Sequence, residues 1–178
     1  MKKYSYLSWA FDLGKVALIL LIVGLFVHYF IATVFVIEGA SMEPNFQDKE
    51  YVAVNRLSFL NKGPKRGDVV LLLFPGRERE KYIKRIIALP GETIKIEGSK
   101  IFINGERLKE DYLPYQTLTE PDLEKTLSSD EYFVMGDNRE NSNDSRVWGT
   151  CPKKNLIGRA VFIVYPLSEW SAVSRVDY

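Results

Sequence analysis

The chain has 178 residues, with 24 Lys or Arg against 23 Asp or Glu and a formal net charge of +1 at pH 7. This near balance excludes the strongly basic field of a nucleic-acid-binding protein, so no nucleic-acid partner is expected. The single cysteine, Cys151, excludes an intramolecular disulfide and a cysteine-rich metal cluster. The length suits one modest domain with an anchor.

A charge-free apolar run extends from Val16 to Ile37, after a short segment that carries three lysines and one aspartate. A helix of about 20 residues spans the hydrocarbon core of a bilayer, which is roughly 30 Å thick. The alternative is a secretory signal peptide that is removed, but its apolar region is normally about 7–15 residues long and small residues precede the cut. Bulky residues occupy positions 34–37, so a retained single-pass anchor is expected.

The charges on the two sides of this run differ in sign. Lysines precede it, and acidic residues follow it at Glu38, Glu43, Asp48 and Glu50. The positive-inside rule therefore places the N-terminus in the cytoplasm and the remainder outside. We expect a cytoplasmic tail at residues 1–15, a transmembrane anchor at 16–37 surrounded by plasma-membrane lipid, and an extracytoplasmic domain at 38–178.

Short β-branched or aromatic runs follow the anchor, and Gly, Pro, Asn or Asp separates most of them, which is a strand-and-turn pattern. The predicted strands are Tyr51–Val54, Val69–Phe74, Tyr82–Leu89, Thr93–Ile96, Lys100–Ile103, Tyr132–Met135 and Ala160–Tyr165. Residues 94–103 are predicted to form a hairpin, and Asn104-Gly105 is a second turn signal. Residues 121–127 could form a short helix. The expected fold is mainly β, an antiparallel sheet or barrel-like domain behind one transmembrane helix.

Ser41 lies in the segment Gly39-Ala40-Ser41-Met42-Glu43-Pro44, just beyond the predicted span. A serine hydroxyl is a weak nucleophile and needs a base within hydrogen-bond reach. The one histidine, His28, lies inside the apolar run, which excludes a Ser-His-Asp triad at a water-facing site.

Lys84 stands among apolar residues of a predicted strand, where burial would lower its pKa and allow it to act as a base. From spacing alone, a surface lysine on an amphipathic strand is the simpler interpretation.

The segment from Gly136 to Arg146 is unusually dense in Asp, Asn, Ser and Arg. Such side chains hydrogen-bond the local backbone and one another, so the loop could hold a neighbouring strand rigidly and orient a lysine. The run Asp137-Asn138-Arg139-Glu140 also hints at calcium, but the central glycine and terminal glutamate of an EF-hand loop are absent. No metal or other cofactor is expected.

Four motifs, taken together and in order, resemble those of the type I signal peptidase family. They are Ser41-Met42-x-Pro44 after a span, Arg66-Gly67-Asp68-Val69-Val70, the segment Lys84–Glu92, and the segment Gly136–Gly149. The resemblance implies an extracytoplasmic, mostly β catalytic domain with a Ser-Lys dyad. It also implies a membrane-bound serine endopeptidase that removes the signal peptides of secreted preproteins through an acyl-enzyme.

Carried over position by position, the resemblance makes Ser41 the nucleophile and Lys84 the general base. Ser142 matches the serine that orients the lysine, and the matching structural residues are Asp144, Arg146, Asp137 and Arg85.

Gly39 stands where the Gram-negative form of the pattern has a serine that contributes to the oxyanion hole, and the Gram-positive branch shares this glycine. The Ser41 N–H and a donor at Gly39 or nearby are the expected oxyanion contacts.

We expect the substrate to bind as an added β-strand. Shallow pockets would admit alanine and exclude larger groups, with Ile37, Met42, Tyr82 and Ile83 as the expected lining residues. The oligomeric state stays open.

Three rival interpretations are weaker. A self-cleaving Ser-Lys repressor would not carry a span, and a penicillin-binding enzyme needs a Ser-x-x-Lys motif that this chain lacks. A non-catalytic membrane-anchored β module would leave the polar loop at 136–149 without a purpose.

Overall fold

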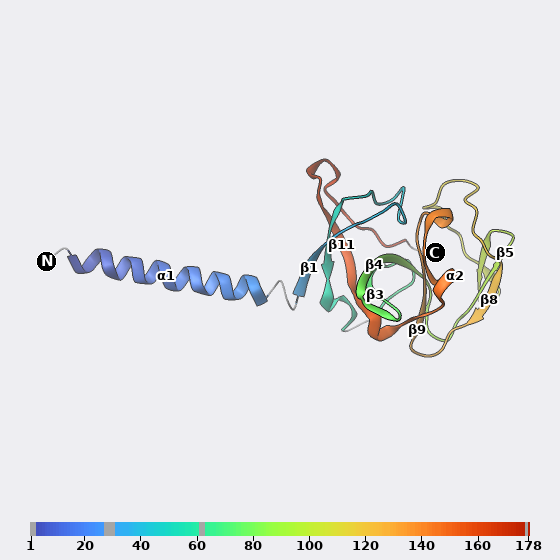
Figure 1. Ribbon diagram of the computed structural model, residues 1–178, viewed down its shortest axis with the longest axis horizontal. Coiled ribbons are helices and arrows are strands. Elements are labelled where there is room, and N and C mark those ends of the chain that lie inside the picture. The colour runs from blue at the N-terminus through green and yellow to red at the C-terminus, as the bar shows by residue number, and fades with distance from the viewer. Residues whose placement is uncertain (1–2, 27–30, 61–62, 177) are drawn as a thin grey trace.

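The computed structural model describes residues 3–26, 31–60, 63–176 and 178. Helix α1 (Lys3–Phe26) extends away from a β domain formed by the rest of the described chain (Figure 1). Its stretch Ser8–Leu25 has a mean hydropathy of 1.8 and exposed side chains, so the helix is long and apolar enough to cross a membrane. This confirms the predicted N-terminal apolar helix; His28 lies outside the described residues.

The apolar run is not helical throughout. Residues Ala32–Val36 form strand β1, which pairs antiparallel with β2 (Tyr51–Asn55), whereas the sequence analysis expected one helix up to Ile37. Thr33, Val34 and Val36 are β-branched, and such side chains favour strands when a partner strand is available. The end of the run therefore belongs to the β domain.

The larger sheet has the order β1-β2-β11-β3-β4-β9-β10, with β12 paired to β11, and every pairing is antiparallel. Its further strands are β3 (Val69–Phe74), β4 (Arg77–Ala88), β9 (Glu131–Met135), β10 (Cys151–Pro152), β11 (Leu156–Tyr165) and β12 (Ser171–Ala172). The predicted mainly β, antiparallel fold is confirmed. In the described part of the chain β1 and β10 do not pair, so the sheet is an open path and not a closed barrel.

A smaller sheet has the order β7-β6-β5-β8 and includes the predicted hairpin, in which Ile94 pairs with Ile103. Its strands are β5 (Thr93–Glu97), β6 (Lys100–Ile103), β7 (Glu106–Arg107) and β8 (Leu123–Thr126). The short helix expected at residues 121–127 is wrong. Leu123 pairs with Ile96 and packs on the core below the sheet, and this burial outweighs any local helical preference.

Short helical turns connect the strands at η2 (Arg56–Phe59), η3 (Arg139–Asn141), α2 (Ser145–Trp148), η4 (Lys153–Asn155) and η5 (Leu167–Glu169). Strand β4 links the three apolar clusters of the domain. Ile87 packs under the small sheet with Phe133, Ile86 packs with Val134, and Ile83 packs with Met42. The strand is therefore held on several sides at the point where Lys84 lies.

Candidate active site

The turn that carries Ser41 is fixed by its apolar neighbours. Met42 and Phe46 are buried, and the Phe46 N–H donates to the Met42 carbonyl at 3.0 Å. Ile37, on the other side, exchanges backbone hydrogen bonds with the segment at 49–50. Because side chains on both sides of Ser41 are anchored in one cluster, its half-buried hydroxyl has a defined position.

Lys84 lies on β4 opposite Val70, and its Nζ lies 2.7 Å from Ser41 Oγ, within hydrogen-bond distance. The structure thus brings the predicted pair into contact across 43 positions of sequence. The lysine is only 4% exposed, which excludes the surface-lysine interpretation.

Burial lowers the pKa of Lys84 from 10.5 to about 8. Desolvation of the ammonium is the largest cause, and the charge of Arg146 lowers the pKa further, whereas Asp144 and Asp137 oppose the shift. An amine with this pKa is about one-tenth neutral at pH 7, compared with about one in several thousand for an exposed lysine. A base is therefore available near neutral pH.

The loop that begins at Gly136 holds the backbone of the serine turn. The Asn138 N–H donates to the Ser41 carbonyl at 3.1 Å, and Asn138 Nδ2 donates to the Ala40 carbonyl at 3.0 Å. A Cβ atom at Gly136 would lie 2.3 Å from the Ser41 carbonyl oxygen and from Ser142 Oγ. Only glycine allows this approach.

Two buried ion pairs hold the loop itself. Arg85 donates from Nε and Nη2 to the two carboxylate oxygens of Asp137, at 2.8 and 2.6 Å. Arg146 contacts Asp144 in the same bidentate way, at 2.8 Å for both bonds, and Asp144 Oδ2 also accepts from the Gly136 N–H. These four predicted structural residues therefore form two ion pairs that hold the loop beside the serine turn.

Ser142 occupies a different arrangement from the expected one. Its hydroxyl is buried against Gly136, but Oγ makes no hydrogen bond within the described residues, to Lys84 or to any other group. The expected Ser142–Lys84 hydrogen bond is therefore not formed in this structure.

The oxyanion contacts also differ from expectation at Gly39. Its φ angle is +86°, and its N–H donates to Asp48 Oδ1 at 2.7 Å. This donor is therefore engaged, whereas the Ser41 N–H has no protein acceptor in the described segments. The positive φ would also strain a serine at position 39, since side-chain-bearing residues rarely adopt it.

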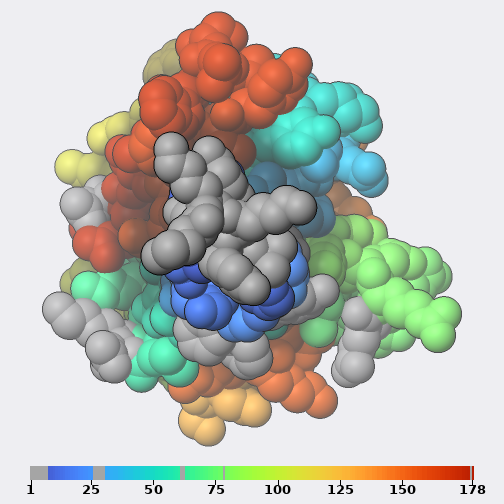
Figure 2. Space-filling model, turned by 90° about the vertical axis from the view of Figure 1, so that its left-hand side faces the viewer, coloured from blue at the N-terminus to red at the C-terminus, as the bar shows by residue number. Residues whose placement is uncertain are grey.

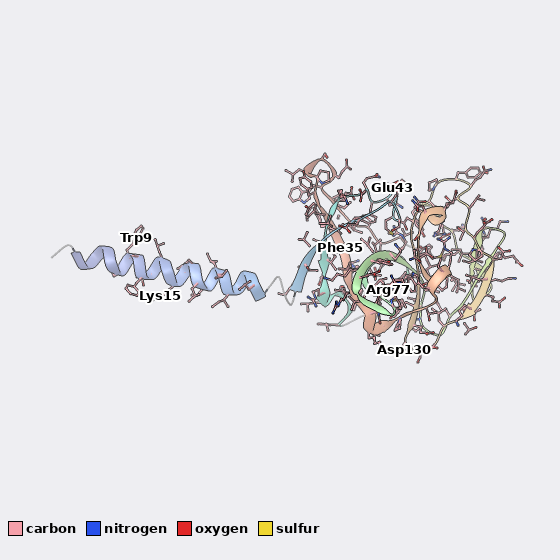
Figure 3. The ribbon with its side chains drawn as sticks, in the orientation of Figure 1. Trp9, Lys15, Phe35, Glu43, Arg77 and Asp130 are labelled. Atoms are coloured by element: carbon pink, nitrogen blue, oxygen red, sulfur yellow. The ribbon has the colours of Figure 1, made fainter. Side chains whose placement is uncertain are left out.

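A cleft of about 650 Å³ opens beside Ser41 and Lys84. Its walls come from the end of β1 and the segment after it, from β4 and from the polar loop: Phe35, Val36, Glu38, Arg79, Glu80, Lys81, Tyr82, Ile83 and Asn143. Figure 3 labels Phe35 on β1 and Arg77 at the start of β4.

Strand edges border this cleft. β1 lies at the edge of the sheet, and β4 gains its second described neighbour, β9, only from Arg85 onward. The edge of β4 before Arg85 is therefore unpaired in the described structure, and its backbone can accept another strand.

The predicted substrate contacts divide into two groups. Tyr82 and Ile83 line the cleft, whereas Ile37 and Met42 are 1% and 0% exposed and lie in the core beside it. Phe35 and Val36 provide the apolar lining that was expected from those two residues. The sequence analysis missed them because it assigned them to the membrane helix; the signal was the β-branched run at 33–36.

The described residues contain no group of three or more His, Cys, Asp or Glu side chains arranged to hold a metal ion. Cys151 is fully buried, and burial raises the pKa of its thiol to about 12, so its sulfur is not a nucleophile near neutral pH. The chemistry that this arrangement can perform depends on the hydroxyl and the amine.

A family model and curated relatives match most of this chain. A family model described as signal peptidase, peptidase S26, matches residues 10–165. Signal peptidase I of Bacillus amyloliquefaciens is 36% identical over 94% of this chain and 92% of its own length. Signal peptidase IB of Staphylococcus aureus is 33% identical over 96% of this chain and 94% of its own. A crystal structure of a signal peptidase I from Enterococcus faecalis V583 covers 55% of this chain and 97% of its own, with 31% identity and a TM-score of 0.49.

Proposed function

Because the chain belongs to the signal peptidase family, peptidase S26, we propose that Ser41 and Lys84 carry out the reaction of that family in it. The protein is a serine endopeptidase that removes signal peptides from preproteins. The 2.7 Å contact between Lys84 Nζ and Ser41 Oγ, with the lysine buried, is the observation that supports the assignment.

In the acylation half of the reaction, neutral Lys84 accepts the Ser41 proton while Oγ attacks the scissile carbonyl carbon. The carbonyl oxygen becomes an oxyanion and accepts a hydrogen bond from the Ser41 N–H. The C–N bond then breaks, and the Lys84 ammonium donates its proton to the leaving amine. The signal peptide is left as an ester on Ser41, and the mature protein has a new N-terminus.

In the second half, Lys84 accepts a proton from water as the water oxygen attacks the ester carbonyl carbon. The tetrahedral intermediate collapses by breaking the bond to Ser41 Oγ, which regains its proton from Lys84. The enzyme returns to its starting state with no other proton donor required.

The supporting residues have separate proposed roles. The pairs Arg85–Asp137 and Asp144–Arg146 hold the loop that positions Ser41 through Asn138. Ser142 stays a predicted orienting residue, on the basis of its buried hydroxyl behind Ser41. The Gly39 N–H could assist the oxyanion only after it leaves Asp48, so we assign the main donor role to the Ser41 N–H.

The substrate is proposed to lie extended in the cleft, where it can pair with the free edge of β4 next to Lys84. Tyr82, Ile83, Phe35 and Val36 would contact its side chains, with Ile37 and Met42 supporting that wall from the core. A peptide series cleaved as well after leucine as after alanine would exclude shallow pockets of this kind.

We propose that α1 anchors the enzyme in the plasma membrane, in contact with lipid, with the N-terminal tail in the cytoplasm and the β domain outside. The lysines before the apolar run support this orientation. Viewed from the side of α1, the β3–β4 turn and the segment after β11 lie around the helix, on the face that would meet the bilayer (Figure 2). Of the expected division into tail 1–15, anchor 16–37 and domain 38–178, we move the boundary between anchor and domain to before Ala32, because β1 pairs with β2 in the β domain.

The dyad is tested by cleavage of a secreted preprotein in detergent, with the new N-terminus read by mass spectrometry. Ser41→Ala and Lys84→Ala should each lower kcat by about a thousandfold or more, since a nucleophile or its base is lost. Ser128→Ala and Lys95→Ala, at partly or fully exposed positions outside the cleft, are matched controls. Activity of either dyad variant within tenfold of the wild type would refute its assigned role.

A further inference from the structure

Tyr112 lies in the long connection between β7 and β8, outside the four motifs that mark the active site. Its ring centroid lies 4.4 Å from Cζ of Arg85, the residue that follows Lys84. The Tyr112 hydroxyl donates to Glu110 Oε1 at 2.8 Å and accepts from Arg139 Nη2 at 2.9 Å. Tyr178, from the end of the chain, donates to it at 3.1 Å. These contacts fix the ring from several directions.

The ring covers the part of Arg85 that has no other partner. Arg85 Nε and Nη2 bind Asp137, and Nη1 binds the Gly67 carbonyl at 3.1 Å, so the edges of the guanidinium are occupied. Arg85 Cζ lies over the Tyr112 ring at the distance of a cation–π contact. Arg85 is 3% exposed, and such a contact is stronger where water is excluded.

The same residue also reaches the segment that carries Ser41. Asn45, four positions after Ser41, donates from Nδ2 to Asp137 Oδ2 at 2.9 Å and to the Tyr112 carbonyl at 3.3 Å. Asp137 therefore binds the turn of Ser41 and the strand of Lys84 together. Tyr112 contacts the Arg85 side of this junction through its ring and the Asn45 side through its backbone.

We propose that Tyr112 is a positioning residue for the cleavage reaction: by covering Arg85 and holding Asn45, it keeps the Ser41 turn and the Lys84 strand in register. The proposal rests on the proposed roles of Ser41 and Lys84. Without the ring, water reaches the Arg85–Asp137 pair and the two segments can move relative to each other. The reacting groups then lose alignment, whereas Tyr112, Arg85 and Asn45 do not themselves line the substrate cleft.

The test uses the full chain in detergent, with kcat and KM measured per titrated active site on a signal-peptide-containing peptide. Tyr112→Leu, which removes the ring, should lower kcat about thirtyfold while KM stays within about twofold, as expected for misaligned reacting groups. Tyr112→Phe keeps the ring and loses only the hydroxyl bonds, so kcat should fall about threefold. Tyr115→Leu is the matched control, because Tyr115 belongs to the same connection and is 93% exposed.

The pH dependence of kcat/KM separates positioning from a purely structural effect. Water entering near Lys84 should move the acidic limb of the Tyr112→Leu profile to higher pH, and the charges facing the amine from the neighbouring loop are Asp144, Asp137 and Arg146. Lower thermal stability with an unchanged profile and a kcat within twofold of the wild type would overturn the proposal. If Tyr112→Leu does not fold, the test uses Tyr112→Phe. A fall in kcat of about threefold supports the proposal, and a kcat within twofold of the wild type overturns it. Lys84→Ala, assayed in parallel, reports on the dyad alone: if it stays active, the proposed function fails, whatever Tyr112 does.

Discussion

At the scale of single residues, the site depends on placing an amine where its charged form is disfavoured. Lys84 keeps its full contribution to stability only above the pKa of an unfolded lysine, near 10.5, because its folded-state pKa is about 8. Between pH 10.5 and about 8, Lys84 is protonated in the unfolded chain but neutral in the folded protein. The free energy of unfolding therefore decreases as the pH falls through this range. A shift of this size corresponds to about 3 kcal/mol of lost stability at neutral pH.

Replacing the amine should therefore stabilise the protein while abolishing its activity. Lys84→Met should raise the free energy of unfolding by about 1–3 kcal/mol at pH 7, and the gain should shrink near pH 10.5. Urea unfolding of the full chain in detergent at both pH values measures this difference. Lys95→Met is a control, since Lys95 lies on β5 and pairs with Glu97 at an exposed position. A methionine variant that is equally or less stable at pH 7 would contradict the account of Lys84 burial.

At the scale of elements, the polar loop after β9 works as a clamp on the serine turn. It follows a buried strand, and two of its carboxylates form ion pairs, Asp137 with Arg85 and Asp144 with Arg146. Asn138 then contacts two successive carbonyls of the turn, at Ala40 and Ser41. The two ion pairs and the Asn138 contacts therefore fix the loop against the serine turn.

Removing one bond of this clamp should affect catalysis more than stability. Asn138→Ala loses the hydrogen bond to the Ala40 carbonyl, which costs about 1 kcal/mol of stability. We expect kcat to fall about tenfold, because small displacements of a nucleophile are strongly amplified in rate. Kinetics and thermal unfolding measured on the same preparation separate the two effects. Asn141→Ala, an exposed neighbour in the loop, is the control, and equal kcat for both variants would argue against the clamp.

The sequence predicts these elements unevenly. β3, β5, β6 and β9 follow from short β-branched runs between turn residues, because their pattern is local. β1 was not predicted, since a charge-free apolar run reads equally well as helix or strand, and only its pairing with β2 decides. The same holds for β8, whose strand depends on the partner Ile96.

The site shows the same division. Ser41 and Lys84 were predicted from motifs whose residues lie close together in the sequence. The engagement of Gly39 by Asp48 was not predictable, because it depends on how the turn closes between them. The contact of Tyr112 with Arg85 depends on the path of a long connection, and no short motif records that path.

At the scale of the whole molecule, the apolar helix is followed closely along the chain by the cleft wall and by the reactive Ser41. α1 ends at Phe26 and β1 begins at Ala32, so few residues separate the proposed anchor from the wall of the cleft. The smaller sheet packs on β4 and β9 and supports them through the cluster around Ile87 and Phe133. A short connection of this kind suits a substrate whose own apolar segment lies in the membrane.

Charges placed in α1 should separate anchoring from chemistry. The double substitution Leu18→Arg and Ile22→Arg should release the enzyme from vesicles, since an arginine at the centre of a span costs about 3 kcal/mol. Both side chains are more than half exposed, and neither contacts the cleft. Peptide cleavage in detergent should stay within about twofold of the wild type, because the site is unchanged. Flotation of vesicles measures the first effect, and retention of the variant on them would argue against α1 as the anchor.

The central claim is that Lys84, buried and in contact with Ser41, has a pKa of about 8, so that about one-tenth of the molecules carry the neutral amine at pH 7. Titration of the lysine side-chain carbons by NMR, in the full chain in detergent, measures this directly. Lys84→Met identifies the Lys84 signal by its disappearance. The account predicts a midpoint at pH about 8. A midpoint near 10.5, the value of an exposed lysine, would contradict it.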